Sequence, residues 1–166
     1  NTAYESGSGV TMLAYPVQCI TPIAPNRELR FHNGSLAQMV NYLAGVGGTC
    51  GTAISTGNNP PTVSGGTDRT IPRNTPFTLT ATGSDPDVND AAALSYVWEQ
   101  IDAGGALYGQ TTDVATFSDA GDPSTTTRPI FRPFSPSSNP SRTFPSLTYI
   151  LNSANVPPGI VSSLYT

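Results

Sequence analysis

The sequence predicts a mainly β protein with a small helix-containing part at its N-terminal end. Gly and Pro number sixteen each, and Ser and Thr are plentiful, which is typical of short strands joined by turns. Only 11% of the 166 residues are charged, against about 25% in an average soluble protein. One early stretch repeats its apolar residues with the period of a helix, whereas later stretches alternate apolar and polar residues.

The predicted helix lies between Asn33 and Gly45, in NGSLAQMVNYLAG. Four apolar residues fall on one helical face at positions i, i+3, i+4 and i+7: Leu36, Met39, Val40 and Leu43. Ser35 and Gln38 have the spacing of a capping box, and Gly45 is expected to end the helix. Asn33-Gly34-Ser35 also has the form of a glycosylation acceptor, but a helix cap explains Ser35 better.

Residues 46–61, VGGTCGTAISTGNNPP, show no periodicity and end in Asn-Asn-Pro-Pro. We expect a domain boundary near Thr56. The chain is therefore predicted to consist of residues 1–50, a linker over residues 51–61, and a second part over residues 62–166.

The second part has the pattern of short strands. Phe77, Leu79 and Ala81 alternate with threonines, and Leu94, Tyr96 and Trp98 alternate in the same way. Further strand candidates are residues 62–64, 69–72, 114–118 and 128–134. Short strands at this spacing, with a Trp on a central one, favour an immunoglobulin-like β-sandwich. Such a sandwich needs about seven strands, so either a last strand lies in the terminal GIVSSLYT or the sandwich is incomplete.

Cys19 and Cys50 are the only cysteines, and neither belongs to a C-x-x-C pair. A disulfide between them is expected and would place the protein outside the cell, in a secreted or periplasmic setting. Two free buried thiols are the alternative.

With a net charge of −4 and no Lys, a nucleic-acid partner is not expected. No apolar run approaches the roughly 20 residues of a membrane span, so no membrane association is expected.

Both parts of the chain carry a resemblance to a known family. SGSGVTMLAY, the later Cys19 and the helix FHNGSLAQMVNYL resemble the end of a bacterial reprolysin-like zinc metallopeptidase domain, a member of the metzincins. In that family a methionine turn lies beneath the catalytic zinc, and Met12 is the matching position. NNPPTVSGGTDRTIPRNTPFTLTATGSDPD, LSYVWEQIDAG and PIFRPFSPSSNPSRTFPSL resemble the module that follows the peptidase in those bacterial proteins.

The resemblance implies a non-catalytic part of a secreted enzyme. Family members bind zinc through H-E-x-x-H-x-x-G-x-x-H, and this sequence has no such motif and a single histidine, His32. The zinc ligands and the general base are expected before Asn1, and the family's trailing module runs on past PSL, so the resemblance implies a chain cut at both ends. Its expected partner is the rest of the peptidase domain. Residues 1–50 would be the C-terminal subdomain of the peptidase, held by a Cys19–Cys50 bond.

A second metal is suggested by the residues themselves. GSDPDVNDA brings together the side-chain oxygens of Asp85, Asp87, Asn89 and Asp90, which could surround a calcium ion. The alternative is a hydrated turn in which these side chains bond their own backbone. His32 is expected to be a surface or packing residue rather than a ligand, and Trp98 a core residue rather than a binding platform.

Two other functions stay open at this point. An extracellular structural or adhesive subunit could assemble by β-strand complementation, a strand of another copy completing a sandwich that lacks its last strands. A simple calcium-binding β-sandwich module is the other possibility.

Overall fold

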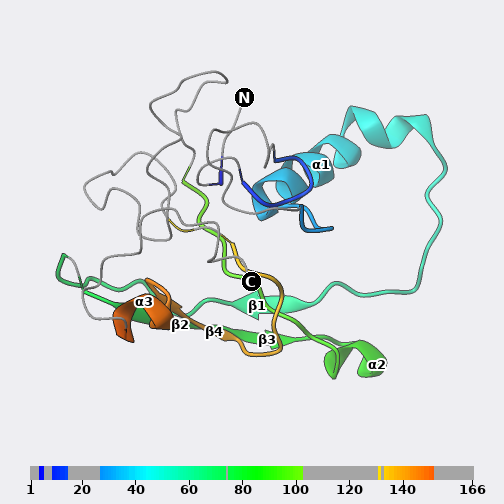
Figure 1. Cartoon of the computed structure of the whole chain (residues 1–166). Coiled ribbons are helices and arrows are strands. Elements are labelled where there is room, and N and C mark those ends of the chain that lie inside the picture. Colours follow the sequence, from blue (N-terminus) through cyan, green and yellow to red (C-terminus); the bar gives the residue numbers. More distant parts are fainter. Residues whose placement is uncertain are drawn as a thin grey trace, which may run out of the picture.

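The computed structural model describes residues 4–5, 9–14, 27–73, 75–102, 131 and 133–151. Its elements, in chain order, are helix α1 (Asn33–Ala44), the 3-10 helix η1 (Val46–Cys50), strands β1 (Thr62–Ser64), β2 (Phe77–Thr80) and β3 (Thr82–Ser84), helix α2 (Val88–Ala91), strand β4 (Ser141–Phe144) and helix α3 (Leu147–Leu151). Figure 1 shows the small helical part formed by α1 and η1, and the strands in two small sheets. None of the described helices combines the length and the apolar character needed to cross a membrane.

Helix α1 confirms the predicted helix, and Gly45 follows its last residue. The predicted capping box at Ser35 and Gln38 is wrong, because the helix already begins at Asn33. The capping residue is His32, whose backbone is extended and whose ring nitrogen Nδ1 accepts a hydrogen bond from the Gly34 N–H at 3.1 Å. Ser35 instead donates its own backbone N–H to the carbonyl of His32, within the first turn.

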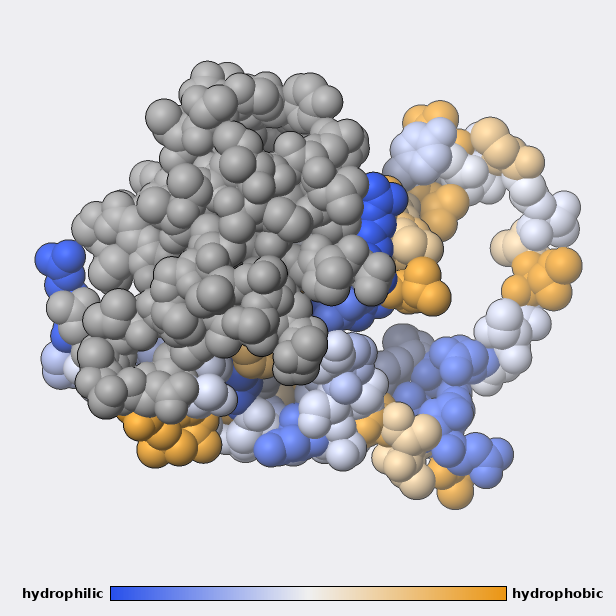
Figure 2. Space-filling model, viewed as in Figure 1, coloured by the Kyte–Doolittle hydropathy of each residue, from blue (hydrophilic) through white to orange (hydrophobic). Residues whose placement is uncertain are grey.

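The apolar face of α1 is largely exposed. Leu36, Val40 and Leu43 have exposed fractions of 44%, 62% and 60%. Figure 2 shows hydrophobic residues on the visible surface of α1 and of the segment that follows it. In the described part of the chain, therefore, the amphipathic pattern of this helix is not used to build a core.

The strands pair antiparallel in two sheets of two strands each. β2 pairs with β4, with Phe77 opposite Phe144, and β1 pairs with β3, with Val63 opposite Gly83. The period-two pattern of PFTLT is confirmed, since Phe77 and Leu79 are half-buried whereas Thr78 and Thr80 are exposed. Cross-strand hydroxyl pairs line the exposed side, with 2.9 Å between the Oγ1 atoms of Thr78 and Thr143.

The stretch after residue 76 was expected to form one strand, but it forms two. The break falls at Ala81, which is buried and whose N–H donates to the carbonyl of Pro140 at 3.1 Å. The chain therefore leaves β4 at this residue and continues as β3 against β1.

Other strand predictions are wrong. Residues 69–72 form no strand, and residues 94–101 form only an isolated bridge between Tyr96 and Ser137. Trp98 is half-buried and lies on no strand. Its indole N–H donates to the carbonyl of Pro140 at 2.9 Å, and the Arg142 side chain donates to the backbone carbonyl of Trp98. Two side-chain hydrogen bonds, one donated by Trp98 and one by Arg142, thus take the place of a strand ladder at Trp98. Of residues 128–134, the described residues 131, 133 and 134 belong to no strand.

Three further expectations concern residues outside the described ranges: the strand at residues 114–118, the terminal GIVSSLYT and one end of the disulfide, Cys19. By contrast, β4 was not expected, because its sequence SRTF lies in a Ser- and Pro-rich stretch.

The core of the β2–β4 sheet is aromatic. Phe77 and Phe144 are stacked with ring centroids 5.1 Å apart, and Phe131 meets Phe144 edge-on at 4.8 Å.

Candidate functional site

Met12 lies in a tight turn. The N–H of Ala14 donates to the carbonyl of Thr11 at 3.0 Å, so residues 11–14 close a turn with Met12 and Leu13 at its tip. Gly9, just before it, has φ of +70°, a conformation that L side chains rarely adopt. A Cβ atom at Gly9 would also stand 2.6 Å from the Cβ of Ala14, so this position requires glycine.

The turn is fixed from two sides. The Glu5 carboxylate accepts the N–H of Val10 at 2.7 Å and of Thr11 at 3.2 Å, and it also accepts the Thr11 hydroxyl. The segment that leads into α1 lies beside the turn, because Met12 donates its N–H to the carbonyl of Arg30 at 2.9 Å and Glu28 donates to that of Val10 at 2.7 Å. The Met12 turn and the start of α1 therefore form one hydrogen-bonded unit.

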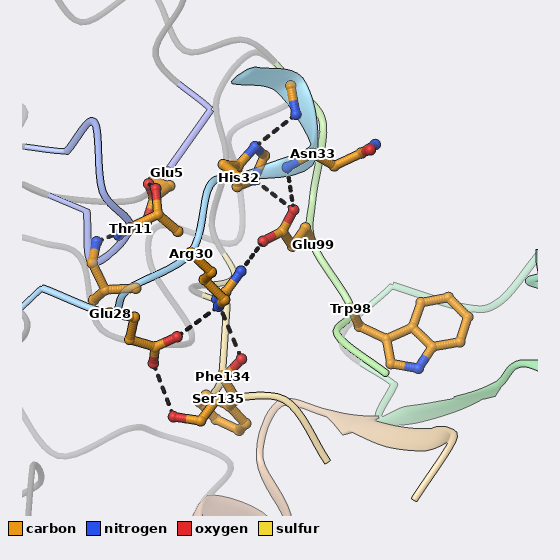
Figure 3. A network of polar contacts seen from close by, with 12 residues as sticks. Glu5, Thr11, Glu28, Arg30, His32, Asn33, Trp98, Glu99, Phe134 and Ser135 are labelled. Atoms are coloured by element: carbon orange, nitrogen blue, oxygen red, sulfur yellow. Dashed lines mark hydrogen bonds and ion pairs between the residues drawn. The ribbon is translucent and has the colours of Figure 1, made fainter. Parts of the chain in front are cut away.

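A second group of polar residues lies at the start of α1. We call Glu28, Arg30, His32 and Glu99 the Arg30 cluster (Figure 3). The Nε of Arg30 is 2.7 Å from Glu28 Oε2, and its Nη1 pairs with Glu99 Oε1. Its Nη2 donates to the carbonyl of Phe134 at 3.3 Å. The guanidinium thus bridges three chain segments that are far apart in the sequence.

His32 is a buried packing residue, with 3% of its side chain exposed. Its ring stacks on Tyr4 with centroids 5.5 Å apart, and its Nε2 lies 3.7 Å from Glu99 Oε2. The same Glu99 oxygen accepts the backbone N–H of Asn33 at 2.6 Å. Because Nδ1 caps α1 and Nε2 faces Glu99, both ring nitrogens are engaged in the fold.

The electrostatics of the Arg30 cluster favour a permanent cation between two carboxylates. Burial alone would lower the pKa of Arg30, but hydrogen bonds and charge interactions with Glu28 and Glu99 outweigh it and raise the pKa above its ordinary value. Arginine is already charged throughout the physiological range, so the raised pKa strengthens the pair without creating a titrating group. The cluster can therefore hold chain segments together.

The described residues do not form the three-histidine site of a catalytic zinc. Such a site uses three protein ligands, whereas the sequence has one histidine, and its nitrogens serve the fold. Within the described ranges no three His, Cys, Asp or Glu side chains are placed to hold a metal ion. Neither the Met12 turn nor the Arg30 cluster supplies zinc ligands.

The acidic loop at Asp85 to Asp90 has defined hydrogen bonds. Asp85 Oδ1 accepts the N–H of Asp87 at 2.8 Å, and the two carboxylate oxygens of Asp87 accept the backbone N–H and the side-chain amide of Asn59, at 2.7 and 2.9 Å. The two bonds from Asn59, the backbone one first, lower the pKa of Asp87. Asn89 and Asp90 lie exposed in α2. The Asp87 carboxylate thus anchors the chain at Asn59, and the Asp85 carboxylate holds the backbone of Asp87. The calcium site stays a prediction.

Cys50 is exposed at the end of η1 and has no disulfide partner among the residues that the structure describes. Its predicted partner Cys19 lies outside those residues, so the disulfide stays a prediction.

Sequence reasoning missed the residues that carry most of the polar contacts: Glu5, Glu28, Arg30 and Glu99. One weak signal was available, because Glu28 and Arg30 are spaced two apart and therefore share a face on an extended backbone. Nothing local could link Arg30 to Glu99, which is 69 residues away in the sequence.

Comparison of the chain with models of protein families, with curated proteins and with solved structures found no match.

Proposed function

We propose that this chain is a non-catalytic part of a secreted zinc metallopeptidase of the reprolysin-like group. In this proposal residues 1–50 complete the peptidase domain, with Met12 beneath the zinc, and residues 62–166 form an immunoglobulin-like accessory module. The zinc and its three histidine ligands belong to another part of the enzyme in this proposal, because the sequence has a single histidine. The proposal rests on the sequence resemblance together with the features below.

The observation that carries the proposal is the exposed apolar surface of the N-terminal part. Besides the three exposed residues of α1, Met12 and Leu13 at the tip of the turn are exposed. In the described part of the chain, the buried apolar side chains are few: Val10, Ala81, Pro133 and Phe144. Exposed apolar side chains on a turn and a helix, with so small a core behind them, need a covering surface. The rest of a peptidase domain would supply it.

The rigidity of the Met12 turn supports the same function. A methionine that forms the floor of a metal site must be held in place by its own backbone, because the thioether side chain is flexible. Here Gly9, Glu5 and the strand-like contact with residues 28–30 hold that backbone. The antiparallel strands and the alternation in β2 support the sandwich in the same proposal.

The test is to purify this chain alone and measure its zinc content and its peptidase activity on an unfolded protein substrate. We expect less than about 0.1 zinc per chain and no cleavage, since a catalytic site needs three ligands. Stoichiometric zinc or cleavage, with contaminating peptidase excluded by mass spectrometry, overturns the proposal.

A second candidate function is assembly with further copies of the chain by strand addition. It is favoured by the two-stranded sheets, in which each strand has one edge that no described residue pairs. Residues 33–67, which include β1, contain no charged side chain that would guard such an edge. Light scattering from micromolar to millimolar concentration tests it: growing assemblies support strand addition, and a constant monomer mass excludes it.

A further inference from the structure

The seven residues 51–57 stand clear of the rest of the described structure. They belong to no helix or strand, and all of them are exposed. A Cβ atom added at Gly51 or at Gly57 would meet nothing within 4 Å. A hydrogen bond of this segment joins near neighbours: the Thr56 hydroxyl accepts the backbone N–H of Asn58 at 3.3 Å. Figure 1 shows the chain between η1 and β1 running in a wide arc away from α1 and the sheets.

Both ends of the segment are anchored. On one side the turns of η1 hold the chain, with Thr49 Oγ1 donating to the carbonyl of Val46 at 2.7 Å. On the other side Asn59 is bonded twice to Asp87, and Pro60 and Pro61 follow. An exposed backbone whose N–H and C=O groups are not engaged is what an endopeptidase takes into its cleft. The anchors limit this accessible backbone to residues 51–57.

The side chains of the segment define the class of enzyme that can use it. Residues 33–67 contain no Lys, Arg, Asp, Glu or His, so peptidases that recognise charged side chains have no target there. Ile54 is the one large aliphatic residue of residues 51–61, and 85% of it is exposed. Its exposed side chain is therefore accessible to a hydrophobic specificity pocket.

We infer that residues 51–57 are a site of limited proteolysis for an endopeptidase with an aliphatic specificity pocket, and that the cut chain stays together without a covalent link. Water adds across the Ala53–Ile54 amide: the C–N bond breaks, Ala53 gains a carboxylate and Ile54 an ammonium group. This inference does not depend on the proposed function.

The contacts of the Arg30 cluster hold the two pieces together after the cut. Arg30 and Asn33 lie before the cut and both bind Glu99, which lies after it. Arg30 also binds the carbonyl of Phe134, and Glu28 accepts the Ser135 hydroxyl at 3.0 Å. Cys19 and Cys50 both precede the cut, so the predicted disulfide would not join the pieces.

The first experiment treats the folded chain with dilute thermolysin, which cuts before aliphatic residues, and follows the products by mass spectrometry. Leu29 and Val88 are internal controls: they are as exposed as Ile54, but backbone hydrogen bonds hold the residues around Leu29, and Val88 lies in α2. We expect the cut before Ile54 to precede cuts at both controls. In Ile54→Asp it should be about tenfold slower or more, because the hydrophobic pocket loses its occupant. Earlier cuts at Leu29 or Val88, or an unchanged rate in Ile54→Asp, overturn the site.

The second experiment passes the cut chain over a size-exclusion column with light scattering. Residues 1–53 and 54–166 should elute together with the mass of the intact chain. In Arg30→Gln they should separate, whereas in the control Arg27→Gln, an exposed arginine, they should not. Separation of the wild-type pieces at neutral pH overturns the inferred complex, whether or not the Arg30 variant folds.

Discussion

Glu99 is the residue through which the start of α1 is attached to the later half of the chain. Its side chain is 8% exposed, and it pairs with Arg30, faces His32 and accepts the N–H of Asn33. In Glu99→Gln the Arg30 guanidinium loses one of two carboxylates in a largely buried setting. We expect the free energy of unfolding to fall by about 1–3 kcal/mol, measured by urea denaturation.

The matched control for Glu99 is Asp68→Asn, which removes one negative charge from an exposed position. It should change the free energy of unfolding by less than about 0.5 kcal/mol. An equal loss in the two variants would mean that net charge, and not the Arg30 cluster, accounts for the effect.

Asp87 gives stability a dependence on pH. Its pKa is lowered in the folded chain, first by the backbone hydrogen bond from Asn59 and then by the side-chain one. The contribution is therefore fully present above the ordinary pKa of an aspartate, and it is lost as the pH falls through the lowered value. In Asp87→Asn the thermal midpoint should fall at pH 7 and differ less from wild type at pH 2, whereas Asp90→Asn should show no such pattern. An Asp87→Asn deficit that does not shrink on acidification contradicts this role.

At the scale of elements, α1 depends on an unusual cap. His32→Ala removes the acceptor of the Gly34 N–H and the ring that stacks on Tyr4, and the loss of the cap alone should cost about 1 kcal/mol. His32→Asn keeps a side-chain acceptor at the cap and should recover part of this loss, measured by thermal unfolding followed by circular dichroism. If the two variants are equally destabilised, the stacking and the Glu99 contact, rather than the cap, hold the helix start.

The β2–β4 sheet depends on Phe144, which is buried between Phe77 and Phe131. Phe144→Ala should lower the free energy of unfolding by about 3–5 kcal/mol, because it leaves a cavity among aromatic rings. Thr143→Ala on the same strand removes only a cross-strand hydroxyl contact and should cost about 1 kcal/mol or less. Similar losses for both would show that the aromatic cluster is not the core of this sheet.

Elements with strong local signals could be predicted from the sequence. The apolar spacing in NGSLAQMVNYLAG placed α1, and the alternation of Phe77 and Leu79 with threonines placed β2. The cap of α1 was missed because His32 is a weak capping residue by type, and its place is set by Tyr4 and Glu99. β4 was missed because a four-residue strand of Ser, Arg, Thr and Phe is defined by its partner β2 and not by its own composition.

At the scale of the whole molecule, the contacts between distant segments could not be predicted. The Met12 turn was expected from the family resemblance, but its link to residues 28–30 and the Arg30 cluster depend on pairs far apart in the sequence. The acidic loop shows the same limit, since Asp87 binds Asn59 rather than only its neighbours. The sequence does show that residues 33–67 carry no charge, but that the apolar residues of α1 are exposed is known only from the structure.

The proposed origin in a zinc metallopeptidase is tested most directly by reading the coding sequence on either side of the codons for Asn1 and Thr166. The account predicts H-E-x-x-H-x-x-G-x-x-H in the same frame before Asn1, close enough for the Met12 turn to lie beneath the metal. A frame that opens near Asn1 behind an export signal, with no such motif, contradicts it and leaves assembly between copies as the function to pursue.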